Sequence, residues 1–281
     1  MFETSPPAQS IDFAGSTHVG MTRTNNEDAW WAGSLAGEIE EPLQTAAGRI
    51  VVGDGAWLAV SDGLGGANAG EVASRITILE TYAALRSVER GQATTGVAWD
   101  AVHQANFAVI KASRSKAKWL GMGATLSFLW IEDSSALIGQ VGDSRIYRMR
   151  KGQLEELSPD HSPVGRLRQS GQLSEREARI HPGRHVIDQC LGGGDPTVVP
   201  DCLQALLEDG DVLLLATDGL TDGVSDSVLT EELSAVERGD ITLDDSAKRL
   251  IDLGNEMSGR DNVTLIVARY HSGESAAESL D

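Results

Sequence analysis

Blocks of strand-like segments alternate with pairs of consecutive helical segments along this chain of 281 residues. Apolar side chains recur every three or four positions in residues 69–88 and again from Ala98 to Ala112, which predicts two successive helices. Short apolar runs then predict strands, and two more helices follow at about 226–237 and 243–257. A regular alternation of single strands and helices would favour a parallel sheet. This order instead predicts an α+β fold, a central antiparallel β-sandwich flanked by pairs of antiparallel helices in four layers.

Two local features of this pattern make specific predictions. In "RIVVGDGAWLAVSD", two apolar runs flank Gly53-Asp54-Gly55, which predicts a β-hairpin. In the first helix, Val72, Ile76, Leu79 and Ala83 stand at spacings of four and three, which is the helical period.

The chain contains no linker strong enough to divide it. We expect an N-terminal arm at 1–13, one domain at 14–270 and an acidic tail at 271–281. Within the domain, residues at about 160–185 are polar and lack a core stripe, which predicts a surface excursion. Residues 32–50 exceed the length of a tight hairpin, and we interpret them as an insertion rather than a loop that selects partners.

Charge and composition limit the partners. Lys and Arg number 23 against 42 Asp and Glu, a net charge of −19 that repels nucleic acid and anionic lipid. The longest apolar run, Val212–Ala216, is too short to cross a bilayer. The N-terminus lacks the pattern of a signal peptide, and two cysteines fit a reduced compartment. We therefore expect a cytoplasmic monomer with no nucleic-acid or membrane partner.

Aspartates stand at the ends of several apolar runs. Asp62, Asp143 and Asp218 each follow such a run, and Asp261 comes just before another. Strand tips lie at the rim of a sheet, where a carboxylate can point into a cleft. Several carboxylates in one cleft repel one another unless cations bridge them, and Mg²⁺ and Mn²⁺ prefer such oxygen ligands. These aspartates therefore predict a divalent-metal site.

The segment "GMTRTNNEDAWW" adds an arginine and two acids just before another predicted strand. Arg23 stands four residues before Glu27, and Asp28 follows Glu27 directly. A guanidinium matches two oxygens of a phosphate group. An arginine beside a carboxylate cluster predicts that an anion is held against metal ions.

Seven motifs in order resemble the metal-dependent protein phosphatases of the type 2C family, in their bacterial form. They are "RTNNED", "AVSDGLGGANAGEVAS", "GMGATL", "VGDSRIY", "LSPDHS", "LATDGLTD" and "GRDNVTLIV". The resemblance covers roughly residues 14–270. It implies a β-sandwich flanked by two helix pairs, with metal ions in a cleft at one end and a mobile flap at about 160–185.

The resemblance also implies a ligand set. Asp62 would bridge two metal ions, with the carbonyl of Gly63 helping to bind one of them. Asp218 and Asp261 would hold the first ion, and Asp143 would bind a weaker third ion together with Asp218. The ions would be Mn²⁺ or Mg²⁺.

Glu27 and Asp28 would serve the second ion, partly through water, and Arg23 would hold the substrate phosphate. Arg23 and Asp28 are accordingly the predicted catalytic residues. By this resemblance, a hydroxide bridging the metals attacks phosphorus. Leu64 stands where eukaryotic members have a histidine, so a metal-bound water is the implied general acid. His161 and His181 are interpreted as structural.

The resemblance therefore implies hydrolysis of phosphoserine and phosphothreonine in proteins, opposing a bacterial serine/threonine kinase. One alternative is a catalytically silent relative that binds phosphoproteins as a regulatory module. Such a relative usually loses a metal aspartate, whereas Asp62, Asp218 and Asp261 are all in place here. Another alternative is a metal-dependent phosphohydrolase of small metabolites.

Overall fold

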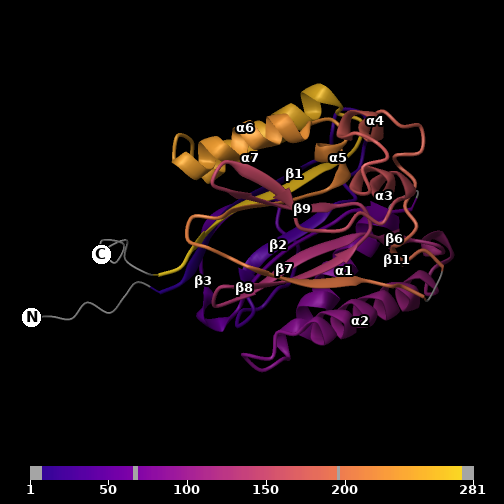
Figure 1. Cartoon of the computed structure of the whole chain (residues 1–281). Coiled ribbons are helices and arrows are strands. Elements are labelled where there is room, and N and C mark those ends of the chain that lie inside the picture. Colours follow the sequence, from indigo (N-terminus) through magenta and orange to yellow (C-terminus); the bar gives the residue numbers. More distant parts are fainter. Residues whose placement is uncertain (1–7, 66–68, 195–196, 274–281) are drawn as a thin grey trace, which may run out of the picture.

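Two antiparallel sheets face each other in the computed structural model, which describes residues 8–65, 69–194 and 197–273 (Figure 1). The first sheet has six strands, in the order β10 (Gln153–Glu156), β9 (Arg145–Arg150), β13 (Val212–Ala216), β14 (Val263–His271), β1 (Ser10–His18) and β3 (Thr45–Val51). The second has five, in the order β12 (Asp201–Leu206), β8 (Ser135–Val141), β7 (Leu126–Glu132), β4 (Ala56–Ser61) and β2 (Ala29–Ser34).

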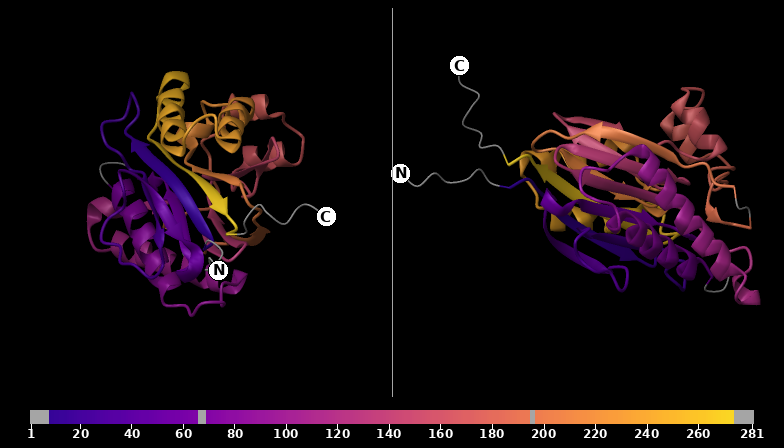
Figure 2. Two further views of the ribbon diagram at one scale, coloured as in Figure 1. Left: turned by 90° about the vertical axis from the view of Figure 1, so that its left-hand side faces the viewer. Right: turned by 90° about the horizontal axis from the view of Figure 1, so that it is seen from below.

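A pair of helices covers the outer face of each sheet, as Figures 1 and 2 show. Helices α1 (Ala69–Arg86) and α2 (Thr95–Ser113) pack on the second sheet, and α6 (Asp226–Arg238) and α7 (Leu243–Met257) pack on the first. This arrangement confirms the predicted four-layer α+β sandwich. Within the described residues, none of the helices combines the length and the apolar character needed to cross a membrane.

The core consists of three apolar layers, one between the sheets and one beneath each helix pair. Strand β14 contributes side chains to two of these layers. Ile266 and Tyr270 point into the layer between the sheets, whereas Leu265 and Val267 point toward α6 and α7. Because both faces are buried, the middle of β14, Leu265–Ala268, appears in the sequence as a continuous apolar run rather than an alternating one.

The hairpin predicted around Gly53-Asp54-Gly55 is wrong. Strand β3 pairs with β1 in the first sheet, whereas β4 pairs with β2 and β7 in the second. A short 3₁₀ helix, η1 (Val52–Asp54), joins them and carries the chain from one sheet to the other. The crossing is possible because Val52 is buried and Gly55 adopts a positive φ of 79°.

Three other predictions need correction. The predicted arm at 1–13 is too long, because strand β1 begins at Ser10; residues 1–7 and 274–281 of the arm and tail lie outside the described residues. His271 still belongs to β14. Residues 32–50 are not a simple insertion, because they include the edge strand β3.

The first predicted helix is confirmed, but the four apolar residues that indicated its period are not its most buried ones. Thr77, Ile78 and Leu85 of α1 are fully buried, whereas Ala83 is exposed. Together with Ala73, these residues form the face that packs inward. Many of the buried positions carry small or hydroxyl-bearing side chains, which a search for large apolar residues passes over.

One end of the sandwich carries the shorter elements. A small sheet has the order β11 (Leu191–Gly192), β6 (Gly123–Ala124) and β5 (Gly63–Leu64). Nearby lie α5 (Asp218–Thr221) and the short helices α3 (Pro163–Gln169) and α4 (Glu175–Arg179) of the predicted flap (Figure 1). The first residue of β1 and the last of β14 pair at the opposite end.

Candidate metal centre

The predicted carboxylates come together at the end of the sandwich that carries α5. Asp62 directly follows β4, and Asp218 begins α5 just after β13. Strand β14 runs antiparallel to β13, so the start of β14, preceded by Asp261, lies at the edge where β13 ends. A cavity of about 530 Å³ is lined by Asp62, Gly63, Asp218 and Asp261 together with Glu27 and Arg23.

The arginine and the acids of "RTNNED" reach the same cavity because β2 pairs with β4. Ala29 lies opposite Ser61, which places Glu27 and Asp28 beside Asp62. The Glu27 amide donates a hydrogen bond of 2.8 Å to Asn262 Oδ1, which holds this segment against the turn before β14. Arg23 Nη2 donates to Asp261 Oδ2 at 2.7 Å, and its side chain is 49% exposed.

The glycines after Asp62 and Asp218 allow close backbone contacts. A Cβ added to Gly63 would lie 2.2 Å from the carbonyl oxygen of Gly70, at the start of α1. A Cβ added to Gly219 would lie 1.8 Å from the carbonyl oxygen of Asn262. Each Asp-Gly pair therefore lets a neighbouring segment press against the strand end, which brings the carboxylates toward one another.

Burial and mutual repulsion disfavour ionisation of these acids. The pKa of Asp28 is raised to about 7, chiefly by burial and also by the nearby Asp261 and Glu27, while hydrogen bonds from Thr264 and Thr217 oppose the rise. Burial also raises the pKa of Asp62 and of Asp218 well above the ordinary range, and neighbouring carboxylates add to both shifts.

Two carboxylate oxygens at this site are buried without a hydrogen bond from any described residue. They are Oδ1 of Asp28 and Oδ1 of Asp218. The other oxygen of Asp28 accepts a hydrogen bond of 2.9 Å from Thr217 Oγ1, which fixes the orientation of the carboxylate. Buried carboxylate oxygens in a polar cavity, with no donor, suit a hard divalent cation. The residues present therefore fit Mn²⁺ or Mg²⁺.

Asp143 lies behind Asp218, beneath the flap. A small cavity of about 20 Å³ is lined by both residues, by Asp160 and by residues of α3 and α4. The pKa of Asp143 is raised to about 7, chiefly by burial and also by the charge of Asp160. The buried Arg145 pairs with Asp160 at 3.1 Å and partly offsets the negative charge around Asp143.

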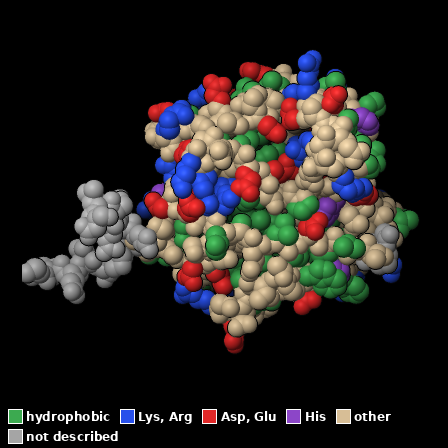
Figure 3. Space-filling view, in the orientation of Figure 1, with side chains coloured by type: hydrophobic (Ala, Val, Ile, Leu, Met, Phe, Trp, Pro, Cys, Tyr) green, Lys and Arg blue, Asp and Glu red, His purple; other side chains and the backbone are tan. Residues whose placement is uncertain are grey.

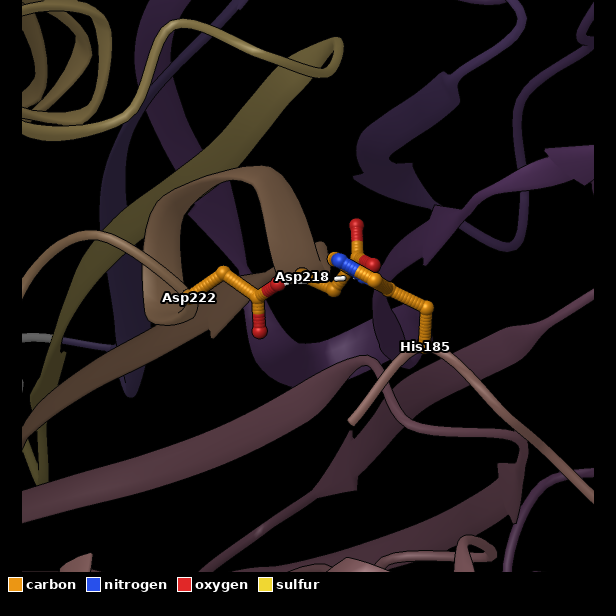
Figure 4. A group of neighbouring side chains, drawn as sticks. All are labelled: His185, Asp218 and Asp222. Atoms are coloured by element: carbon orange, nitrogen blue, oxygen red, sulfur yellow. Dashed lines mark ion pairs between the residues drawn. The ribbon is translucent and has the colours of Figure 1, made fainter. Parts of the chain in front are cut away.

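The sequence analysis missed Asp222, Arg184 and His185. Arg184 Nε and His185 Nδ1, at the C-terminal end of the predicted flap, lie 3.2 and 3.3 Å from Asp222 Oδ2. Figure 4 shows the His185 ring turned toward Asp218 and Asp222, both carried by the turn at α5. A ligand atom from each of these three residues lies within 4.8 Å of the other two. Spacing could have revealed Asp222, four positions after Asp218, but no local signal marks His185.

The two histidines predicted to be structural have structural contacts. His161 is buried, accepts a hydrogen bond from the Gly142 amide at 3.3 Å, and lies 2.8 Å from Asp201 Oδ2. His181 Nδ1 accepts a hydrogen bond of 3.0 Å from the Gly183 amide. These contacts hold the two ends of the flap.

Comparisons with known proteins give a consistent result. The family described as protein phosphatase 2C matches residues 39–239. Protein phosphatase PhpP of Streptococcus pneumoniae is 33% identical over 264 residues, which is 93% of this chain and 98% of PhpP. The crystal structure of the Mycobacterium tuberculosis serine/threonine phosphatase PstP/Ppp has a TM-score of 0.76 at 32% identity, covering 93% of this chain and 99% of that one.

A further structure, the catalytic domain of the serine threonine protein phosphatase PstP in complex with two manganese ions, has a TM-score of 0.75 and 30% identity. The match covers 94% of this chain and 100% of that one. The family match spans more than half of the chain, and Glu27, Asp28 and Asp261 lie outside the matched residues. The chain therefore belongs to the protein phosphatase 2C family.

Proposed function

We propose that this chain uses the carboxylate-lined cavity to hydrolyse phosphoserine and phosphothreonine in proteins with the help of divalent metal ions. As a member of its family the chain is a serine/threonine protein phosphatase. The observation that carries the proposal is the convergence of Asp62, Asp218 and Asp261 on one cavity, with Arg23 on its wall. A silent binding module would have no need of buried carboxylate oxygens that lack donors.

The ligand roles are part of this proposal. Asp62, Asp218 and Asp261 would hold a first ion, with the Gly63 carbonyl as a further ligand. Asp62 would also reach a second ion, served by Glu27 and Asp28, and Asp143 with Asp218 would hold a weaker third one. When bound, such ions supply a water of lowered pKa and neutralise charge on the phosphate.

The remaining roles belong to protein groups. Arg23 is half exposed and already faces Asp261, so its guanidinium is placed to bind two oxygens of an incoming phosphate. Thr217 keeps the Asp28 carboxylate in one orientation. A covalent cysteine intermediate is disfavoured at Cys202, because burial raises the pKa of its thiol to about 11 and keeps it protonated at neutral pH.

The cellular setting is also proposed. The phosphatase would act as a monomer in the cytoplasm on proteins phosphorylated by a cognate serine/threonine kinase. The two cysteines, of which Cys202 is a free thiol, suit a reducing compartment. Light scattering coupled to size-exclusion chromatography tests whether the protein is a monomer in solution.

Substrate class can be tested by comparing kcat/KM for a phosphothreonine peptide, a phosphotyrosine peptide and glycerol phosphate, each with Mn²⁺ and with Mg²⁺. We expect the phosphothreonine peptide to be the best substrate. The Arg184→Ala variant, which loses the link between Asp222 and the C-terminal end of the flap, should change peptide kinetics more than hydrolysis of p-nitrophenyl phosphate. Equal kcat/KM for the peptide and glycerol phosphate would favour a phosphatase of small metabolites.

A further inference from the structure

A basic patch stands out on this acidic protein. It consists of Lys111, Arg114, Lys116 and Lys118, at the end of α2 and in the segment that follows it. All four side chains are exposed. Although the chain has 42 Asp and Glu residues, none occurs between Asp100 and Glu132. The patch therefore has no acidic neighbours in sequence.

The cations of this patch also lack acidic partners in space among the described residues. Most of the 23 Lys and Arg side chains form ion pairs with carboxylates. On the face shown in Figure 3, many basic side chains lie beside acidic ones. Within the described residues, by contrast, no carboxylate lies within ion-pair distance of Lys111, Arg114, Lys116 or Lys118. Their positive charge is therefore available to a partner.

Helix stabilisation explains only part of the patch. Lys111 is in the last turn of α2 and Arg114 is its C-cap, where cations interact favourably with the helix dipole. Lys116 and Lys118 lie beyond the helix. The Lys116 ammonium lies 3.9 Å from the centre of the Trp119 ring, and Leu120 beside it is 77% exposed. The surface thus combines positive charge with an apolar contact.

The segment that follows the patch reaches the rim of the candidate metal centre. The Met122 amide donates a hydrogen bond of 3.1 Å to the Trp119 carbonyl, and a Cβ on Gly65 would lie 3.4 Å from Met122 Cα. Gly65 lines the cavity that contains Asp62. The end of α2 lies at the end of the molecule opposite to the last residue of β14 (Figures 1 and 2).

The number of residues along the chain sets an upper limit on the distance between the basic patch and the cavity. Lys118 is four residues from Met122, a distance of at most about 14 Å, and Gly65 is three residues from Asp62, at most about 11 Å. An extended peptide rises about 3.3 Å per residue. A segment of about nine residues is therefore long enough to reach from the cavity to the patch.

We propose that the basic patch docks an acidic segment, rich in Asp or Glu, that flanks the phosphorylated residue of a substrate protein. This inference rests on the proposed function. The net charge of −19 disfavours extended polyanions such as nucleic acid or an anionic membrane, because they would meet the acidic surface around the patch. A short acidic segment stays within about 8 Å of the patch, where screening at physiological salt leaves the attraction effective.

The test compares three phosphothreonine peptides of equal length, with Glu residues before the phosphothreonine, with Glu residues after it, or with Gln at all of these positions. We expect one of the acidic peptides to have a KM roughly ten-fold below that of the Gln peptide at low salt. The Arg114→Glu/Lys118→Glu variant should lose this preference. The matched control is Arg238→Glu/Lys248→Glu, which makes the same change in net charge on α6 and α7 and should keep the preference.

Hydrolysis of p-nitrophenyl phosphate separates this inference from the proposed function. Its kcat/KM should be equal in the wild type and in both double variants. If no phosphate ester is hydrolysed, the proposed function fails, and fluorescence anisotropy with labelled peptides in EDTA then decides the docking. Tighter binding of an acidic peptide, lost only in Arg114→Glu/Lys118→Glu, would support the patch.

Equal KM values for the three peptides in the wild type, or equal losses in the two double variants, would overturn the inference. If no phosphate ester is hydrolysed, equal binding of the acidic and Gln peptides in the anisotropy measurement would also overturn the inference. Vesicles containing phosphatidylserine provide the last comparison. Vesicle binding that depends on Arg114 and Lys118, without any peptide preference, would assign the patch to a membrane instead.

Discussion

Replacing Asp28 by asparagine should stabilise the metal-free protein and do so most strongly at high pH. Burial raises the pKa of Asp28 from 3.8 to about 7, so the folded state holds a proton that the unfolded chain releases. Between these two values the free energy of unfolding therefore falls as pH rises. A difference of about three pKa units corresponds to about 4 kcal/mol above pH 7.

Asparagine at position 28 carries no charge and can still accept the hydrogen bond from Thr217 Oγ1 through its own Oδ1. At pH 5 the buried Asp28 of the wild type is protonated, so most of the free-energy cost of burying its charge is avoided. The stability difference between Asp28→Asn and the wild type should therefore grow by about 3 kcal/mol between pH 5 and pH 8. If the buried amide lacks a full set of hydrogen-bond partners, the free energy of unfolding of Asp28→Asn is lowered equally at pH 5 and at pH 8, so the growth of the difference is unaffected.

Urea unfolding in EDTA, followed by tryptophan fluorescence across pH 5 to 8, measures this difference. Asp133→Asn, which removes an exposed carboxylate, is the control and should leave the pH dependence of stability unchanged. With Mn²⁺ present, Asp28→Asn should gain less stability than the wild type because it has lost a proposed ligand. A stability difference for Asp28→Asn that is the same at pH 5 and pH 8 would refute the reasoning.

Three further predictions concern the same cavity. Arg23→Ala should lower kcat/KM for a phosphothreonine peptide at least ten-fold in steady-state kinetics. The same variant should change the free energy of unfolding by no more than about 1 kcal/mol, because the ion pair between Arg23 and Asp261 is exposed. Gly219→Ala should lower the thermal midpoint strongly in calorimetry, since its Cβ would lie 1.8 Å from the Asn262 carbonyl oxygen; an unchanged midpoint would contradict the close contact. Mn²⁺ at a thousand times its Kd should stabilise the wild type by about 4 kcal/mol in thermal unfolding, and no shift would argue against a metal centre.

The convergence of the carboxylates could be predicted because it depends on few assumptions. Asp62 and Asp218 each stand at the end of a continuous apolar run, and in an antiparallel sandwich such ends meet at shared edges. The helices could be predicted from their period. The motifs then gave a resemblance to one family, and the family match confirms it.

The failures share a physical cause, which is long-range pairing. Two apolar runs around a glycine turn look alike whether they pair with each other or cross between sheets. Strand β3 belongs to the first sheet because it pairs with β1, with Val51 opposite Ser10, far away in sequence, and η1 then carries the chain to β4 in the second sheet. His185 reaches Asp222 only because the flap folds back over α5, and neither residue has a local pattern that reveals this contact.

The central claim is metal-dependent hydrolysis by the carboxylate cluster, and one measurement tests it most directly. Phosphate release from a phosphothreonine peptide is compared for the wild type and Asp218→Asn, each with Mn²⁺, with Mg²⁺ and with EDTA. We predict turnover by the wild type with at least one metal, none in EDTA, and a loss of at least a hundred-fold in Asp218→Asn despite a folded structure. Equal turnover with and without EDTA, or an Asp218→Asn variant as active as the wild type, would contradict it.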